Sequence, residues 1–264
     1  MREKILDIVR KSTYLPRKVL DNLIFAWFLK RSNQWSILQP FFEKDILVVG
    51  NGPSLNQTPL SKIHMVSIGM NKINLIYDKT DWRPDIIACV NGLVLSQNKD
   101  FFNKTETILI LPVRAWYLGV KKRKNIIFVN LSNDEKLHDD ISKEISAGCT
   151  VTFYAMQIAT HLKAKSINIV GVDHNFSFKG KEHDIQKMDT PDPNHFSPDY
   201  FKDQFWALPN LDHSERLYNL VKDYCDNHKI PVTDYTVEGK LQVFKKGSIE
   251  NLMNQNVKFK NISV

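Results

Sequence analysis

The sequence predicts an α/β protein with a Rossmann-like fold: an open, mostly parallel sheet with helices on both faces, preceded by a basic amphipathic helical arm. Three observations predict it. Short apolar runs alternate with segments of helical periodicity, small or polar residues follow these runs at once, and positive charge is concentrated near the N terminus. Apolar runs that alternate with helices are typical of buried parallel strands joined by crossover helices.

The charge distribution sets the arm apart from the rest of the chain. Residues 1–40 contain eight basic and three acidic residues, which gives +5 of the chain's net +7. We therefore expect an N-terminal arm over 1–40 and a separate α/β domain over 41–264. A nucleic-acid-binding protein would spread its basic residues over a face or groove, so no nucleic-acid partner is expected.

The arm is predicted to form two amphipathic helices broken at Pro16. The first carries Ile5, Ile8 and Val9 on one side. The second covers 17–31, with apolar residues at three-to-four spacing and basic residues at both ends. Such a helix suits an anionic membrane surface, which residues 1–32 would contact. Docking of the helix on its own domain, or on a second subunit of a homo-oligomer, is the alternative.

The apolar part of the arm is too short to cross a membrane. Its longest clean run, 23–29, is far below the about 20 residues that a bilayer requires. No small-residue cleavage site follows it, so a signal peptide is not expected. The three cysteines form no CxxC pair, which fits a reducing compartment. We expect a cytoplasmic protein, peripheral on the inner face of the cytoplasmic membrane.

The remaining elements follow in order along the chain. The apolar runs at 45–49, 65–68, 86–90, 107–111, 126–129 and 166–170 predict strands, and a last short strand begins at Val232. Residues 149–162 predict a helix that is apolar nearly all round, and 213–228 predict an amphipathic helix. The long polar stretch 174–212 is predicted to be a lid over the site, because loops of this length in compact domains are usually functional or disordered.

Ligands of such sheets bind outside the carboxyl ends of the strands, so the residues there are the first candidates for a site. Amide side chains suit sugar hydroxyls and nucleobase edges. The Gly-x-Gly turn could approach a phosphate or could be only a tight turn, and it is neither a Walker loop nor a GxGxxG motif. These candidates are Gly50, Asn51, Gly52, Ser54, Asn71, Asn91, Asp173 and His174.

Two further candidates lie elsewhere. The small residues Ser146, Ala147, Gly148 and Thr150 precede the apolar helix, where exposed N–H groups could bind an anion or Ser146 or Thr150 could simply cap the helix. His195 lies in the polar stretch beside Asp, Asn and Tyr residues. No HxH, HExxH or DxD pattern is present, so no metal site is predicted, and Cys149 is expected in the core.

These motifs together resemble a known family. The residues are GNGPSL after the first strand, asparagines after the second and third, TVT before the apolar helix, then GVDHNF and NHFSPDYF. In this order the pattern resembles the MptE-like family over about residues 45–245. It is also distantly similar to the family 42 glycosyltransferases, the bacterial sialyltransferases.

The sialyltransferase resemblance implies a metal-independent inverting transfer, without a cofactor, from a CMP-activated acidic sugar (sialic acid or a related nonulosonate or Kdo). The acceptor would be a glycan or glycolipid of the cell surface. It implies that His195 is the general base, that Asn51, Gly52 and Ser54 line the CMP site, that Asn71 and Asn91 contact the donor, and that 146–150 lie near the donor carboxylate or the cytidine. The sialyltransferases also place two tyrosines after the Gly-hydrophobic-Asp turn. Here the first aligns with Asn175, and Lys179, Lys181 and Tyr200 are the candidates to replace them.

Two alternatives stay open. The MptE-like resemblance implies pyrophosphate transfer from ATP to a hydroxymethylpterin, which would need magnesium held by carboxylates such as Asp173, Asp192 and Asp199. The other alternative is a non-catalytic membrane-associated subunit that retains the nucleotide-binding fold.

Overall fold

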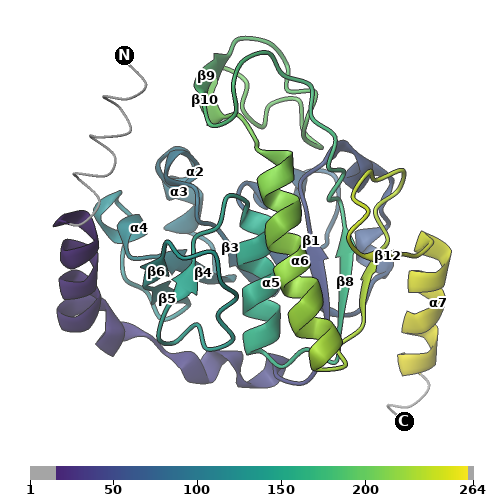
Figure 1. The fold of residues 1–264 in the computed structure, drawn as a ribbon, viewed down its shortest axis with the longest axis horizontal. Coiled ribbons are helices and arrows are strands. Elements are labelled where there is room, and N and C mark those ends of the chain that lie inside the picture. Colours follow the sequence, from purple (N-terminus) through teal and green to yellow (C-terminus); the bar gives the residue numbers. More distant parts are fainter. Residues whose placement is uncertain (1–15, 261–264) are drawn as a thin grey trace.

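The computed structural model describes residues 16–260, with the side chains of all of these except Phe28, Ser32 and 255–260. It confirms the predicted fold class. Eight parallel strands form one sheet in the order β12–β11–β8–β1–β2–β3–β4–β5, with helices around it (Figure 1). Among the described residues, no helix is both long and apolar enough to span a bilayer.

The elements have the following bounds. The strands are β1 (Asp45–Val49), β2 (Val66–Met70), β3 (Ile86–Ala88), β4 (Ile108–Pro112), β5 (Ile126–Val129), β6 (Leu131–Ser132), β7 (Ile145–Ser146), β8 (Ser166–Val170), β9 (Ile185–Met188), β10 (Gln204–Ala207), β11 (Val232–Asp234) and β12 (Lys245–Lys246). The helices are α2 (Gly92–Gln97), α3 (Lys99–Phe102), α4 (Arg114–Tyr117), α5 (Val151–His161), α6 (Leu211–Asn227) and α7 (Ile249–Lys260), and residues 16–24 are also helical.

The central strands are mostly apolar because both faces of the sheet are buried. In β1, Leu47 and Val49 point to one core cluster, whereas Ile46 and Val48 point to the other. Helices α5 and α6 cover the second cluster (Figure 1), and Thr152 to Thr160 of α5 are all buried. This burial explains why α5 is apolar nearly all round.

The strand order places a ligand-binding crevice at a defined point. The chain runs from β1 outward through β2, β3, β4 and β5, and then returns to β8 on the other side of β1. The direction of winding therefore reverses between β1 and β8. In open α/β sheets, ligands bind at the carboxyl ends of the strands at such a switch point.

The second predicted arm helix docks on its own domain. It runs as an α-helix over 16–24, a π-helix over Phe25–Leu29 and a 3₁₀ helix over Lys30–Ser32, and Phe25 and Leu29 are buried. Asn33 then pairs with the edge strand β5: its Nδ2 donates to the Phe128 carbonyl at 2.7 Å and its Oδ1 accepts from the Phe128 N–H at 2.9 Å. The predicted first helix, with Ile5, Ile8 and Val9, lies outside the described residues.

The stretch 174–212, called the lid segment below, contains an antiparallel hairpin of β9 and β10 that the sequence does not predict. The hairpin projects beyond the carboxyl ends of the central strands (Figure 1). The lid segment is also bonded to the turn after β1, since the Phe196 N–H donates to the Asn51 carbonyl at 2.9 Å. It therefore forms one wall over the switch point.

Candidate functional site

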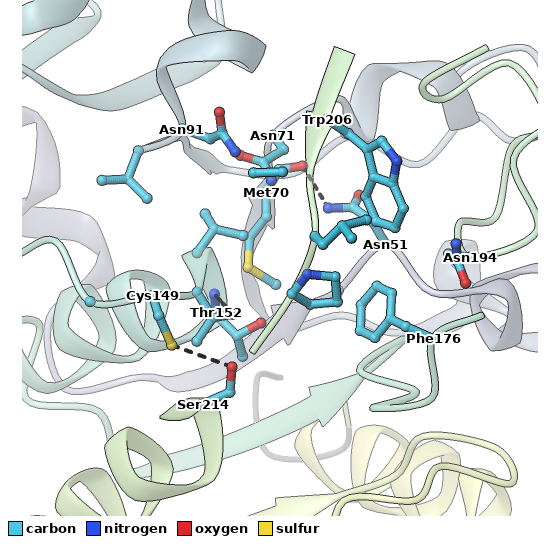
Figure 2. Close-up of a pocket in the computed structure, with 18 of the residues that line it drawn as sticks. Asn51, Met70, Asn71, Asn91, Cys149, Thr152, Phe176, Asn194, Trp206 and Ser214 are labelled. Atoms are coloured by element: carbon cyan, nitrogen blue, oxygen red, sulfur yellow. Dashed lines mark hydrogen bonds between the residues drawn. The ribbon is translucent and has the colours of Figure 1, made fainter. Parts of the chain in front are cut away.

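A cavity of about 750 Å³ lies at the switch point. The ends of β1, β2, β3 and β8, the starts of α5 and α6, and the lid segment form its walls. In Figure 2, Asn71 and Asn91 lie on one side of it, Cys149, Thr152 and Ser214 on another, and Phe176 and Trp206 on a third. Of the residues predicted from sequence, the following line it: Gly50, Asn51, Gly52, Asn71, Asn91, Ala147, Gly148, Thr150, Asp173, His174, Asn175 and His195. Three others, Ser54, Ser146 and Tyr200, do not.

The glycine turn after β1 is a tight turn packed against the end of β8. A Cβ on Gly50 would lie 2.1 Å from the Gly171 carbonyl oxygen, and a Cβ on Gly52 would lie 1.9 Å from an Asp173 carboxylate oxygen. The N–H groups of Gly50 and Gly52 donate to carbonyls of β8 and of the residue after it. These two N–H groups are therefore already paired within the protein, and the glycines are required for close packing.

Ser54 faces Asp173 and not the cavity. Its N–H and its Oγ donate to the two carboxylate oxygens of Asp173, at 3.0 and 2.6 Å. Burial raises the pKa of Asp173, against the hydrogen bonds from Ser54, which lower it. The pair joins the turns after β1 and β8, so Ser54, which lies outside the cavity lining, fixes the orientation of the Asp173 carboxylate.

The asparagines after β1 and β2 present free acceptors. Asn51 donates through Nδ2 to the Met70 carbonyl at 3.1 Å (Figure 2), while the Oδ1 atoms of Asn51 and Asn71 are buried without a hydrogen-bond partner among the described residues. Asn91 caps α2, its Oδ1 accepting from the Leu93 N–H at 2.9 Å. A buried acceptor left unpaired costs free energy, so ligand N–H or O–H groups at Asn51 and Asn71 would be stabilising.

The start of α5 opens on the cavity. Thr150 is the N-cap, and its Oγ1 accepts from the Thr152 N–H at 3.3 Å. Gly148 has φ +56°, which favours glycine, and its Cβ would lie 2.7 Å from the Phe153 ring. Ser146 is fully buried and donates to the Asp134 carbonyl at 2.7 Å. The positive end of an eleven-residue helix thus points at the cavity.

His195 is the best-oriented titratable group of the cavity. Its Nδ1 lies 2.7 Å from Oδ2 of Asp192, whose side chain is fully buried. Asp192 is itself held, since its Oδ1 accepts from the Asn194 N–H at 2.8 Å. A carboxylate can only accept, so Nδ1 carries a proton and Nε2 of the neutral ring is a base. The Asp192–His195 spacing was present in the sequence, but the pairing was not predicted.

Aromatic rings fix the plane of the imidazole. Tyr200 stacks on His195 with 4.0 Å between ring centroids, and Phe201 packs against its edge at 5.2 Å. Tyr200 is buried, and its hydroxyl accepts from the Lys72 N–H at 3.2 Å. Tyr200 therefore lies behind the base, and Lys179 and Lys181 are exposed on the lid segment outside the cavity lining.

A buried lysine holds the lid segment against β2. Lys72 Nζ donates to the Tyr200 carbonyl at 2.7 Å and to Gln204 Oε1 at 2.5 Å, and lies 4.5 Å from the centre of the Phe201 ring. Burial lowers the pKa of Lys72 to about 8. The sequence did not predict that Lys72 is buried, because a lysine after a strand is usually exposed.

Two arginines that the sequence analysis did not single out also line the cavity. Arg114 of α4 donates to the Val90 carbonyl, and its Nε is buried with no hydrogen-bond partner among the described residues. Arg17 comes from the N-terminal segment and donates to the Tyr117 hydroxyl at 3.3 Å. Burial, and then the charge of Arg17, lower the pKa of Arg114. The two residues are 97 positions apart, so only the fold brings them together.

The donor set does not fit a magnesium site. Asp173 is the one carboxylate among the described residues that line the cavity, and both of its oxygens accept hydrogen bonds from Ser54. Asp192 is bound to His195, and Asp199 is exposed. His174, the other candidate at this strand end, lies 2.9 Å from Glu215 through Nε2. Magnesium is usually held by available carboxylates together with substrate phosphates.

One cluster with metal-ligating side chains lies outside the cavity lining. Asp134, His138 and Glu144 come within 4.8 Å of one another. His138 Nε2 is 2.8 Å from Asp134, and Glu144 is 3.5 Å from Lys18. Ion pairs within the protein account for these contacts.

Comparisons with known proteins agree with this architecture. The family model described as 6-hydroxymethylpterin diphosphokinase MptE-like matches residues 26–179. A solved structure of the MAf glycosyltransferase from Magnetospirillum magneticum AMB-1 is similar in fold, with a TM-score of 0.52 and 13% sequence identity over 84% of this chain. This chain spans only about 37% of that glycosyltransferase. No curated protein matches the sequence.

Proposed function

We propose that this chain, which belongs to the MptE-like family, is a metal-independent inverting glycosyltransferase that uses a CMP-activated acidic sugar in the synthesis of cell-surface glycans or glycolipids. The observation that carries the proposal is the Asp192–His195 pair, with the imidazole facing the cavity at the switch point. The fold shared with a glycosyltransferase supports the choice of reaction class.

The cavity supports a nucleotide-sugar donor. Its volume of about 750 Å³ suits a ligand larger than a pterin alone. The free Oδ1 atoms of Asn51 and Asn71 would accept from the cytosine amino group or from sugar hydroxyls. The N-terminal end of α5 would stabilise the phosphate of CMP, where negative charge grows as the glycosidic bond breaks.

His195 would supply the base. Its Nε2 would take the proton of the acceptor hydroxyl while that oxygen attacks the anomeric carbon from the face opposite CMP. The bond from the anomeric carbon to the phosphate oxygen breaks, and CMP leaves with the electron pair. Asp192 would stabilise the imidazolium that forms, and Tyr200 and Phe201 would keep the ring in the attacking plane.

The diphosphokinase alternative rests on the family description. It calls for a magnesium site, and the single lining carboxylate is already engaged by Ser54. The donor set of the cavity therefore favours glycosyl transfer over pyrophosphate transfer. The Asp192–His195 pair at the cavity is also the observation that favours an enzyme over a non-catalytic subunit.

The test is CMP release in EDTA. The full chain is incubated with a panel of CMP-activated acidic sugars and a bacterial membrane extract as the source of acceptor. We expect release with at least one donor, and at least a hundredfold less release with His195→Ala, since a positioned base contributes about 10²–10⁴-fold. No CMP release with any donor, together with magnesium-dependent AMP release from ATP and a hydroxymethylpterin, would overturn the proposal in favour of the diphosphokinase.

A further inference from the structure

The segment 16–29, called the N-terminal helix here, has two different faces. Phe25 and Leu29 are buried in the core beside β5. The opposite face carries Val19, Leu20, Leu23 and Trp27, each at least half exposed and Trp27 at 72%. We call these four residues the outer face. Exposed apolar residues gathered on one helix mark an interaction surface rather than scattered surface residues.

The outer face cannot turn inward, because polar contacts fix the N-terminal helix on the domain. The Asn130 amide donates to Asn22 Oδ1 at 2.8 Å, Lys18 donates to the Leu131 carbonyl, and its Nζ lies 3.5 Å from Glu144. These contacts use one side of the helix and leave the apolar side to solvent.

The charge around the outer face is complementary to an anionic surface. Residues 16–41 contain four basic side chains and one acidic side chain. Lys30 and Arg31 are exposed at the C-terminal end of the helix, beyond Trp27. An apolar face with Trp and Leu, flanked by basic residues, is the composition of helices that lie in the interface of anionic bilayers.

The same helix supplies one residue of the cavity. Arg17 and Arg114 both line it, and Arg114 Nε is buried with no hydrogen-bond partner in the part of the chain that the structure describes. Burial raises the pKa of Asp21, and the charges of Arg17, Arg114 and Lys18 lower it by less. Lys18 is also paired with Glu144, so Asp21 is the one carboxylate among the described residues left to offset the two arginines. This end of the cavity has an excess of positive charge that an oxyanion would neutralise.

We propose that the N-terminal helix docks on an anionic lipid bilayer through the outer face, and that Arg17 and Arg114 bind the oxyanion of a lipid-anchored acidic acceptor at that end of the cavity. Docking stands independently of the catalytic assignment, whereas the acceptor rests on the proposed function. The substrate class is then an amphiphile with a phosphate or carboxylate near the reacting hydroxyl.

Vesicle sedimentation tests docking. The full chain is mixed with phosphatidylcholine vesicles with and without phosphatidylglycerol. We expect binding only to the anionic vesicles, weakened by salt, and a loss of about tenfold or more in affinity with Leu20→Asn/Leu23→Asn/Trp27→Ser. The matched control, Phe205→Asn, changes an apolar residue of the lid segment that is also more than half exposed and lies outside the cavity lining, and it should bind as the unchanged chain does.

Two outcomes would overturn docking on lipid. One is equal vesicle binding by the outer-face variant and the unchanged chain. The other is a dimer in solution that the outer-face variant converts to a monomer, which would assign the outer face to a second copy of the chain.

Thermal unfolding tests the oxyanion site, with inorganic phosphate and with monomeric dihexanoyl phosphatidic acid as probes. We expect the phosphatidic acid to raise Tm more than inorganic phosphate does. This stabilisation should be lost with Arg114→Gln and with the milder Arg17→Gln. It should be retained with Arg31→Gln, which alters an arginine outside the cavity lining. Equal shifts with both probes would overturn a lipid source, and no shift would overturn the site. Each variant is also tested with CMP, so that a failure of nucleotide binding is seen separately.

Discussion

The carboxylate behind His195 decides which ring nitrogen can take a proton. Asp192 does not line the cavity, yet its Oδ2 lies 2.7 Å from Nδ1 of His195. We expect Asp192→Asn to reduce transfer by about 10²–10⁴-fold, because an amide can favour the wrong tautomer and does not stabilise the imidazolium. CMP binding should be unchanged. The comparison is kcat and the CMP-induced thermal shift for both proteins.

The control for this substitution lies three residues away. Asp189 is an exposed carboxylate of the lid segment, 3.0 Å from Lys187, and Asp189→Asn should leave kcat unchanged. A similar loss of activity in both variants would mean that any lost charge of the lid segment matters, and that Asp192 does not act through His195.

The close packing of the glycine turn gives a second prediction at the residue scale. Gly52→Ala would place a Cβ 1.9 Å from Asp173 and disturb its hydrogen bonds with Ser54. We expect a loss of about 2 kcal/mol or more in the free energy of unfolding. Gly92→Ala is the matched control, since its Cβ would meet nothing within 4 Å, and it should change stability by about 1 kcal/mol at most. Urea unfolding of both variants measures the difference, and equal effects would contradict this account of the turn.

The sequence predicted cavity-lining residues correctly where those residues directly follow strands. Asn51, Asn71, Asn91 and Asp173 were predicted because parallel strands bring their carboxyl ends to one edge. The partners of these residues could not be predicted in the same way. Ser54 is bonded to Asp173, and Arg17 and Arg114 line the same cavity, although each pair comes from segments about a hundred residues apart.

At the scale of elements, burial decided which parts were predictable. The strands β1, β5 and β8 have the predicted bounds because they are apolar on both faces. The hairpin of β9 and β10 is only partly buried, with Ile185 and Phe205 exposed and Trp206 buried, and β6 and β7 have two residues each, so none of these strands has a periodic signal. Tertiary contacts, and not local pattern, define those four strands.

Lys72 allows the attachment of the lid segment to be tested through pH. Burial lowers the pKa of Lys72 to about 8 in the folded protein, whereas the unfolded chain keeps the ordinary value of about 10.5. Between pH 8 and 10 the unfolded state therefore binds more protons, and this group makes stability rise with pH. We expect the free energy of unfolding to rise from pH 7 to 9 relative to Lys72→Met.

The difference in the pH dependence of unfolding between the unchanged chain and Lys72→Met isolates Lys72, because all other titrating groups are common to both proteins. Lys62→Met, at an exposed lysine, should show the pH dependence of the unchanged chain. A Lys72→Met protein with the same pH dependence as the unchanged chain would contradict the assignment of the shifted pKa to Lys72.

At the scale of the whole molecule, one end of the sheet carries every group of the proposed chemistry. The strand ends would bind the donor, the lid segment brings the base, and the N-terminal helix adds Arg17 and presents the outer face. An enzyme arranged in this way could act on an acceptor held in a membrane without crossing it. Fold class and the position of the cavity could be predicted from the sequence, whereas the approach of the N-terminal helix to the cavity could not.

The most direct test of the account is nucleotide binding by the full chain, measured as a thermal shift with CMP, CDP, UDP, GDP and ATP, each in EDTA and in magnesium. A ligand at a hundred times its Kd adds about 2.7 kcal/mol, which raises Tm by several degrees in a domain of this size. The account predicts a shift with CMP in EDTA. A shift only with ATP and magnesium would contradict it and favour the diphosphokinase, and no shift with any nucleotide would favour a non-catalytic subunit.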